Sequence, residues 1–190
     1  MAGPVTKDTS SLGLGLAQIR IGNSATHINT INPALSASDS IGALTKSQLT
    51  LEIEVWKHMS GFPQNEDHSI ILSKKASIAG EAEELSPYNL ALAAGVDPTT
   101  YSLAHSGEIP LGALNDIPFL RAEMHYTFPN GNFFIPVFPR AQVMSTVSLD
   151  FQSTDNVKIP MTIEAKKASS EVSGGSVLWD TAPLGRIWFK

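Results

Sequence analysis

The sequence predicts a mainly β fold with one short α-helix, and three observations support this. Apolar and polar side chains alternate along several stretches, most strictly over residues 49–56, as in a strand with one buried and one exposed face. Residues 129–132 (Pro-Asn-Gly-Asn) predict a hairpin turn, because Asn-Gly readily adopts positive φ angles. Only residues 86–95 combine the signals that start and stop a helix. We therefore expect a strand-rich chain.

The first predicted strand covers residues 14–21, where the alternation slips near Ala17. The next covers residues 49–56 and is the element around which the chain is organised. A polar loop over residues 60–68, too long for a tight turn, leads to a strand over residues 69–79. One face of the 49–56 strand is expected to be buried and the other exposed. The buried face would hold Leu49, Leu51, Ile53 and Val55, and the exposed face would hold Thr50, Glu52, Glu54 and Trp56.

The helix is predicted over residues 87–94. Ser86 is the expected N-cap, and Pro87 suits the first helical position, where its missing N–H costs no hydrogen bond. Gly95 supplies the C-terminal stop, and Pro98 lies just beyond it. The short spacing between these signals predicts about two turns of helix.

Four further strands are predicted after the helix, over residues 119–128, 133–138, 141–151 and 157–165. Pro136 and Pro139 mark the 133–138 strand as an edge strand or the site of a bulge. We expect a single domain over residues 1–190. It consists of a polar N-terminal arm (1–12), a β core (13–165) and an extended C-terminal segment (166–190).

Composition excludes several classes of protein. With 42% hydrophobic residues the chain can bury a core, and a formal charge of −5 argues against a surface that grips nucleic acid by neutralising phosphates. The chain has no cysteine, so it has no disulfide framework and no thiolate metal site. No stretch predicts a signal peptide or approaches the roughly 20 apolar residues of a membrane span. We expect a soluble protein that is made in a cytoplasm or released by lysis.

The sequence does not predict an enzyme. Its five histidines lack metal-ligand spacing, and there is no nucleophile elbow, phosphate loop or dinucleotide fingerprint. Glu52 and Glu54 share one strand face, but a solvated face explains them better than catalysis. We therefore predict no catalytic residue, no cofactor and no metal site. Loss of turnover on mutation of Glu52 or Glu54 would revive the enzyme class.

The order of elements over residues 49–96 resembles that of a tailed-bacteriophage major tail tube protein. The order is strand, long loop, strand, the acidic step Glu81-Ala82-Glu83-Glu84, and the helix, and the strand-rich run 119–165 is compatible with it. The resemblance implies a β-sandwich or rolled β-barrel with a helix on its flank. Subunits of this family form hexameric rings whose inner strands join into one barrel. The rings stack into a hollow tube that conducts double-stranded DNA, and the family also resembles the inner tubes of injection machines.

The resemblance assigns roles to particular residues. Glu52, Glu54 and Glu123 would face the lumen, where negative charge repels phosphates and lets DNA slide. The expected partners are further copies of the chain, the tape-measure, tail-terminator and baseplate or tail-tip proteins, and in contractile tails a sheath. The location would be the virion, after assembly in the host cytoplasm. The inter-subunit contacts would be made by Phe62, Glu66, Asp67, Trp188 and Phe189.

Two alternatives remain at the level of sequence. Another virion β protein, such as a capsid-decorating or tail-terminating subunit, would form trimers or single rings. A β-sandwich module that binds sugars or peptides would need an exposed aromatic platform, and the aromatic content of 7% makes this alternative weaker. Open-ended polymers would favour the tube subunit over both.

Overall fold

The computed structural model describes residues 15–62, 65–98, 108–110, 116–151 and 156–190, over which the protein is mainly β. These residues form one antiparallel sheet of seven strands in the order β1-β4-β5-β6-β3-β2, with β7 paired to β5, and the sheet does not close into a barrel. The helices are α1 (Ser24–His27) and α2 (Pro87–Ala93), and two 3-10 turns lie at Ala37–Asp39 and Val177–Trp179. The strands are β1 (Gln18–Asn23), β2 (Leu44–Ser60), β3 (Asn65–Ala82), β4 (Leu120–Thr127), β5 (Phe133–Val143), β6 (Ile159–Ala165) and β7 (Arg186–Phe189).

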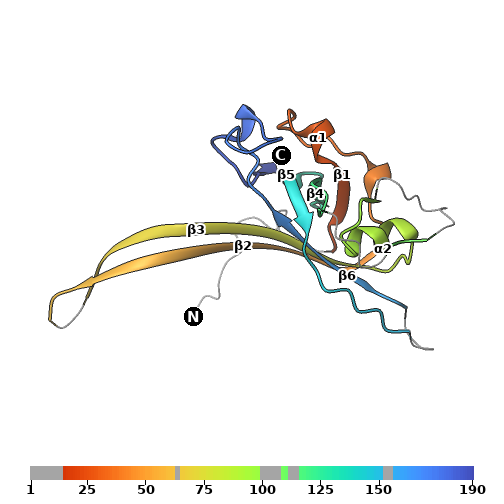
Figure 1. Ribbon diagram of the computed structural model, residues 1–190, viewed down its shortest axis with the longest axis horizontal. Helices are drawn as coiled ribbons and strands as arrows, with labels where there is room; N and C mark the ends of the chain where they lie inside the picture. Colours follow the sequence, from red (N-terminus) through yellow and green to blue (C-terminus); the bar gives the residue numbers. More distant parts are fainter. Residues whose placement is uncertain (1–14, 63–64, 99–107, 111–115, 152–155) are drawn as a thin grey trace.

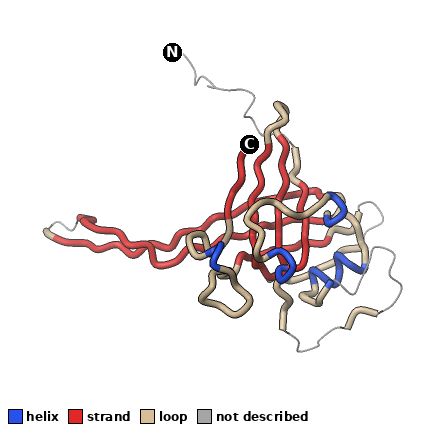
Figure 2. Tube along the Cα trace, turned by 90° about the horizontal axis from the view of Figure 1, so that it is seen from above, coloured by secondary structure: helices blue, strands red, loops and turns tan. Residues whose placement is uncertain are grey.

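β2 and β3 form a hairpin that projects far beyond the rest of the sheet (Figures 1 and 2). The two strands pair from Leu44 opposite Ala82 to Ser60 opposite Asn65. β6 pairs with β3 only from Ser77 to Ala82. Among the described residues, no third strand continues along the outer part of the hairpin.

The main core lies inside the curve of the sheet. β1, at one end of the strand order, packs across onto β3 near the other end. Gly80 permits this close approach, because a Cβ at that position would lie 2.7 Å from Cδ1 of Ile19. α2 adds Leu92 and Ala93 to this core beside β6. The sheet is therefore strongly curved although it stays open.

A second, smaller core lies on the other face of β5. Ile135 and Val137 point into it, while Phe138 belongs to the main core, as strand alternation requires. Trp179 fills this second core, is fully buried, and donates its Nε1–H to the Ile28 carbonyl oxygen at 2.7 Å. The C-terminal segment is thus held against the sheet.

The helix prediction is confirmed. α2 begins after Ser86, whose side chain accepts a hydrogen bond from the Asn89 amide at 3.1 Å, and Pro87 occupies the first turn. Gly95 follows the helix with a φ of 72°, a conformation in which a glycine carries no steric penalty.

The prediction of a long loop over residues 60–68 is wrong. Both strands continue into it, and β3 already begins at Asn65. The sequence did not predict strands in this region because it lacks alternating apolar residues. Polar side chains that pair across the two strands take their place. Lys57 Nζ lies 2.8 Å from Glu66 Oε2, and His58 Nδ1 lies 2.6 Å from Asp67 Oδ1.

Within the C-terminal segment, for which no strand was predicted, residues 186–189 form β7 and pair with β5. The expected strand over residues 141–151 ends at Val143. β5 is an interior strand rather than an edge, but the pairing register with β4 shifts between Leu120 and Ala122, opposite Pro139, which confirms the bulge. The first strand lies at 18–23, and the N-terminal arm (1–12) lies outside the described residues.

Candidate functional site

The projecting part of the β2–β3 hairpin, residues 49–60 and 65–76, is called the arm below. Sequence alternation predicts that one face of its first strand is buried. The structure instead leaves the apolar side chains open to solvent, because no second layer formed by the described residues reaches them. Phe62 at the turn is 102% exposed. Eight apolar side chains of the arm are between 40% and 61% exposed: Leu51, Ile53, Val55, Trp56, Met59, Ile70, Ile71 and Leu72.

The register divides the arm into two faces, since residues directly opposite each other on paired strands share a face. The apolar face contains Leu51 opposite Ala76 and Val55 opposite Ile71. Its cations are Lys74, opposite Ile53, and Lys57, opposite Ser69. The polar face has the following pairs: Glu52 and Lys75, Glu54 and Ser73, Trp56 and Ile70, and His58 and His68.

Glu52 and Glu54 lie where the sequence places them, exposed on one strand face. The Ser73 hydroxyl donates to Glu54 Oε2 at 2.9 Å. Glu52 has Lys75 as its cross-strand neighbour. The negative charge of this face is therefore partly balanced at its inner end.

The expectation that Glu123 lies on an exposed face is wrong, because its side chain is fully buried. The segment between β1 and β2 crosses this face of β4 and covers it. Glu123 accepts hydrogen bonds from Arg121 Nε at 2.7 Å, from the Ala34 amide at 2.9 Å and from the Leu35 amide at 3.3 Å. His125 Nε2 lies 2.8 Å from its second oxygen. Glu123 therefore holds a loop in place and is not proposed as a lumen residue.

Arg121 completes this buried network. It donates to three carbonyl oxygens of the covering segment, those of His27, Thr30 and Asn32, at 2.7–2.9 Å. The sequence contains a signal for this pairing that alternation alone does not bring out. Arg121 and Glu123 have opposite charges and are two residues apart, so they share one strand face.

The tip of the arm, defined as residues 57–62 and 65–68 and so including the turn residues 61–62, carries the predicted contacts Phe62, Glu66 and Asp67. Its carboxylates are held by neighbouring side chains. The pKa of Glu66 is lowered by hydrogen bonds from Lys57 and then Ser69, and the pKa of Asp67 is lowered by hydrogen bonds from Ser60 and then His58. Both carboxylates therefore stay ionised in neutral solution, beside an exposed phenylalanine.

The two remaining predicted contacts, Trp188 and Phe189, differ in their exposure to solvent. Trp188 lies half-buried against the second core of its own chain, so its packing is explained within one subunit. Phe189 is 68% exposed, and its ring centroid lies 5.0 Å from that of Phe134. Phe189 therefore remains available for a second copy.

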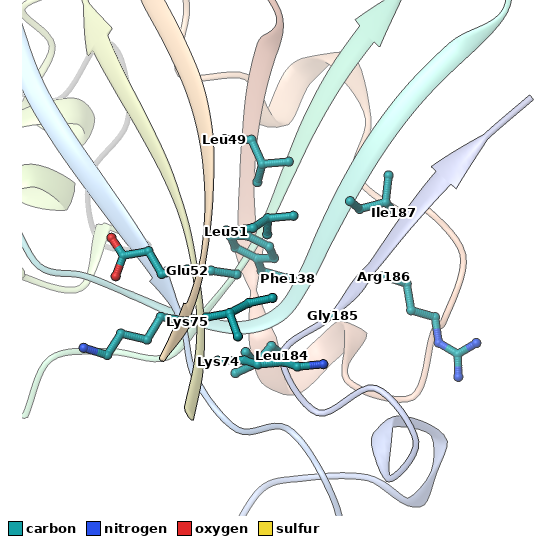
Figure 3. Close-up of a pocket in the computed structure, with 12 residues that line it drawn as sticks. Leu49, Leu51, Glu52, Lys74, Lys75, Phe138, Leu184, Gly185, Arg186 and Ile187 are labelled. Atoms are coloured by element: carbon teal, nitrogen blue, oxygen red, sulfur yellow. The ribbon is translucent and has the colours of Figure 1, made fainter. Parts of the chain in front are cut away.

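A groove of about 290 Å³ lies between the apolar face at the base of the arm and the segment that leads into β7 (Figure 3). Leu51 and Ile187 face it from its two sides, while Glu52 and Lys75 extend to the opposite side of the hairpin. Sequence reasoning missed this groove, because it depends on the return of the C-terminal segment. Its apolar lining consists of Leu49, Leu51, Ile53, Ala76, Phe138, Leu184 and Ile187.

The described residues contain no group of three or more histidine, aspartate, glutamate or cysteine side chains placed to hold a metal ion. No helix within the described ranges has the length and apolar character needed to cross a membrane. No protein-family model matches the chain, and neither does any curated protein sequence. The arm, its tip and the groove are therefore the features from which a function can be argued.

Proposed function

We propose that this protein is a self-assembling structural subunit. Its copies would form hexameric rings that stack into a hollow tube, as in the tail tubes of bacteriophages, and the tube would conduct double-stranded DNA. The observation that carries this proposal is the exposed apolar arm. Large contiguous apolar surfaces are uncommon on monomeric proteins and mark sites of association.

The arm also has unpaired strand edges. No strand of the described residues pairs with the outer edge of β2, or with the outer edge of β3 over residues 65–76. Long apolar edge strands pair readily with other chains, and monomeric proteins protect such edges with charges, prolines or covering segments. Residues 55–56 and 70–72 carry neither a charge nor a proline, although Glu54, Lys57 and Lys74 lie close to them. Pairing with further copies would satisfy both the backbone groups and the apolar side chains of this stretch.

The charge distribution suits a conduit for DNA. The chain has a formal charge of −5, and Glu52 and Glu54 are exposed on the polar face of the arm. With the apolar face turned toward protein, this face would be turned toward the lumen. A lumen without a continuous cationic surface does not bind phosphates strongly, so DNA can move through it.

The proposal is tested by negative-stain electron microscopy and analytical ultracentrifugation of the purified protein over a range of concentrations. We expect open-ended hollow tubes or stacked rings. The double variant Leu51→Glu/Ile53→Glu should fold but stay monomeric, because it places charge on the apolar face. Val177→Glu is the matched control and should assemble normally, because Val177 is 70% exposed and lies in the body of the protein, that is, in the described residues outside the arm and its turn. A discrete trimer, or assembly unaffected by the arm variant, would overturn the proposal.

The lumen assignment has a separate test. Tubes of the double variant Glu52→Lys/Glu54→Lys should still form but should retain short duplex DNA at low salt, because lysines neutralise phosphates and release counterions. Wild-type tubes should release the same DNA. The measurement is co-sedimentation of labelled duplex with tubes as a function of salt. Equal retention by both tubes would place these glutamates outside the lumen.

A further inference from the structure

We propose that the tip of the arm of one copy docks into the groove at the base of the arm of another copy, with Phe62 entering the groove. This inference rests on the proposed function, and it names the surface that receives the arm.

The tip has the properties of a docking segment. Phe62 is the most exposed of the large apolar side chains of the described residues, at 102%. Aromatic side chains are frequent anchors at the centres of interfaces, because one ring buries a large area with few rotatable bonds. With histidines neutral, Lys57, Glu66 and Asp67 give the tip a formal charge of +1 − 2 = −1.

The groove has complementary properties. Its inner surface is aliphatic and aromatic, and its volume of about 290 Å³ suits a side chain of an approaching segment. Sites for drug-sized ligands are typically larger, at ~300–1,000 Å³, so the groove is better matched in size to one side chain than to a whole ligand. Four charged residues contribute atoms to its lining, but Glu52 and Lys75 extend to the opposite side of the hairpin and the Arg186 guanidinium donates to Thr181, which leaves Lys74 as the charged group beside the groove. An apolar groove with a lysine beside it thus matches an aromatic tip with a net negative charge.

The contact can form only between two copies. Phe62 follows a paired strand that runs from Leu51 in the groove to Ser60, nine steps or about 30 Å at roughly 3.3 Å per residue. A paired hairpin cannot fold back over that distance onto its own base. Tip and groove are different surfaces, so the contact is heterologous, and each bound copy presents a free tip or a free groove for the next. A contact of this kind closes into a ring or continues as an open stack, depending on the rotation between successive copies.

The absence of cysteine allows a direct test by disulfide trapping in the full chain. One variant carries Phe62→Cys, and a second, distinguishable by a size tag, carries Ile187→Cys. The two are mixed under assembly conditions with a mild oxidant. We expect a mixed disulfide dimer to form several-fold faster than between Ile187→Cys and Phe151→Cys. Phe151, which is 71% exposed, is the control because it is an exposed phenylalanine distant in sequence from the tip.

The outcomes separate this inference from the proposed function. Assembly with equal trapping rates for the two pairs would overturn the docking of the tip in the groove and leave the tube proposal standing. Failure of the wild-type chain to assemble under any condition would overturn both. Rapid disulfide formation within one chain that carries both Phe62→Cys and Ile187→Cys, at concentrations where it is monomeric, would also contradict the inference.

A substitution that forms no covalent bond gives an independent measurement. Phe62→Ser should raise the concentration needed for assembly by roughly 10- to 100-fold, as expected for the loss of one buried aromatic side chain. Val177→Ser removes an apolar side chain that is 70% exposed and lies outside the arm, and it should leave that concentration unchanged. An unchanged assembly concentration in Phe62→Ser would show that the groove is not occupied by the tip.

Discussion

The body and the arm contain residues of the same type that differ in burial. Trp179 in the body is fully buried and hydrogen-bonded, whereas Trp56 on the arm is 46% exposed. Glu123 in the body is fully buried and accepts bonds from two side chains and two backbone amides, whereas Glu52 on the arm is exposed. The body therefore completes its contacts within one chain. The arm does not, and its side chains should matter for association rather than for folding.

The largest expected difference between body and arm concerns the two tryptophans. Trp179→Ala should lower the free energy of unfolding by about 3–5 kcal/mol, because it empties the centre of the second core and leaves the Ile28 carbonyl without its donor. Trp56→Ala should change it by no more than about 0.5 kcal/mol, as is usual for surface positions. Urea denaturation at a concentration where the protein is monomeric measures both. Similar losses in the two variants would mean that the arm folds onto the body in solution.

The second difference concerns the two glutamates. Glu123→Gln should destabilise the protein by on the order of 3 kcal/mol, because it leaves the buried Arg121 guanidinium without a compensating charge. Glu52→Gln should lie within about 0.5 kcal/mol of the wild type. Loss of the Glu123 contacts should also release the segment between β1 and β2, which hydrogen exchange at the Ala34 and Leu35 amides can detect.

The acid limb of the stability curve gives a further measurement on the same variant. Burial alone would raise the pKa of Glu123, but hydrogen bonds from His125, the Ala34 amide and Arg121 outweigh it and hold the pKa below its usual 4.5. A lowered pKa in the folded state means that this stabilisation is complete above pH 4.5 and is lost as the pH falls through the lowered value. The wild type should therefore lose more stability than Glu123→Gln below pH 4.5. Parallel curves would contradict the assignment.

Local signals predicted the elements that depend on neighbouring residues. Ser86, Pro87 and Gly95 determine the helix by themselves, and Asn-Gly determines the turn before β5, where Gly131 has a φ of 84°. Alternation located β4 for the same reason. The C-terminal segment could not be predicted in this way. Its position depends on Trp179 reaching Ile28, a residue 151 positions away in the sequence.

The candidate site shows the limit of alternation as a signal. Alternation predicts that the two faces of a strand differ in polarity, but it does not predict which segment, if any, covers the apolar face. On β2 the apolar face projects beyond the body and stays exposed, whereas on β4 a loop buries the polar face with Arg121 and Glu123. The exposure of Glu52 and Glu54 was predicted correctly because no segment of the described chain crosses them. The groove required the tertiary contact between the hairpin and residues 184–187.

The smallest expected difference comes from two serines that lose the same hydroxyl group. Ser86→Ala removes the cap of α2 and should lower the free energy of unfolding by about 1 kcal/mol, because the Asn89 amide loses its acceptor in a buried position. Ser73→Ala removes a hydroxyl that donates to Glu54 at the solvent-exposed surface of the arm. Water replaces that bond, so the loss should be smaller than in Ser86→Ala. Thermal unfolding monitored by circular dichroism compares the two variants. A larger loss in Ser73→Ala would show that the arm contributes to the stability of the single chain, contrary to the division between body and arm.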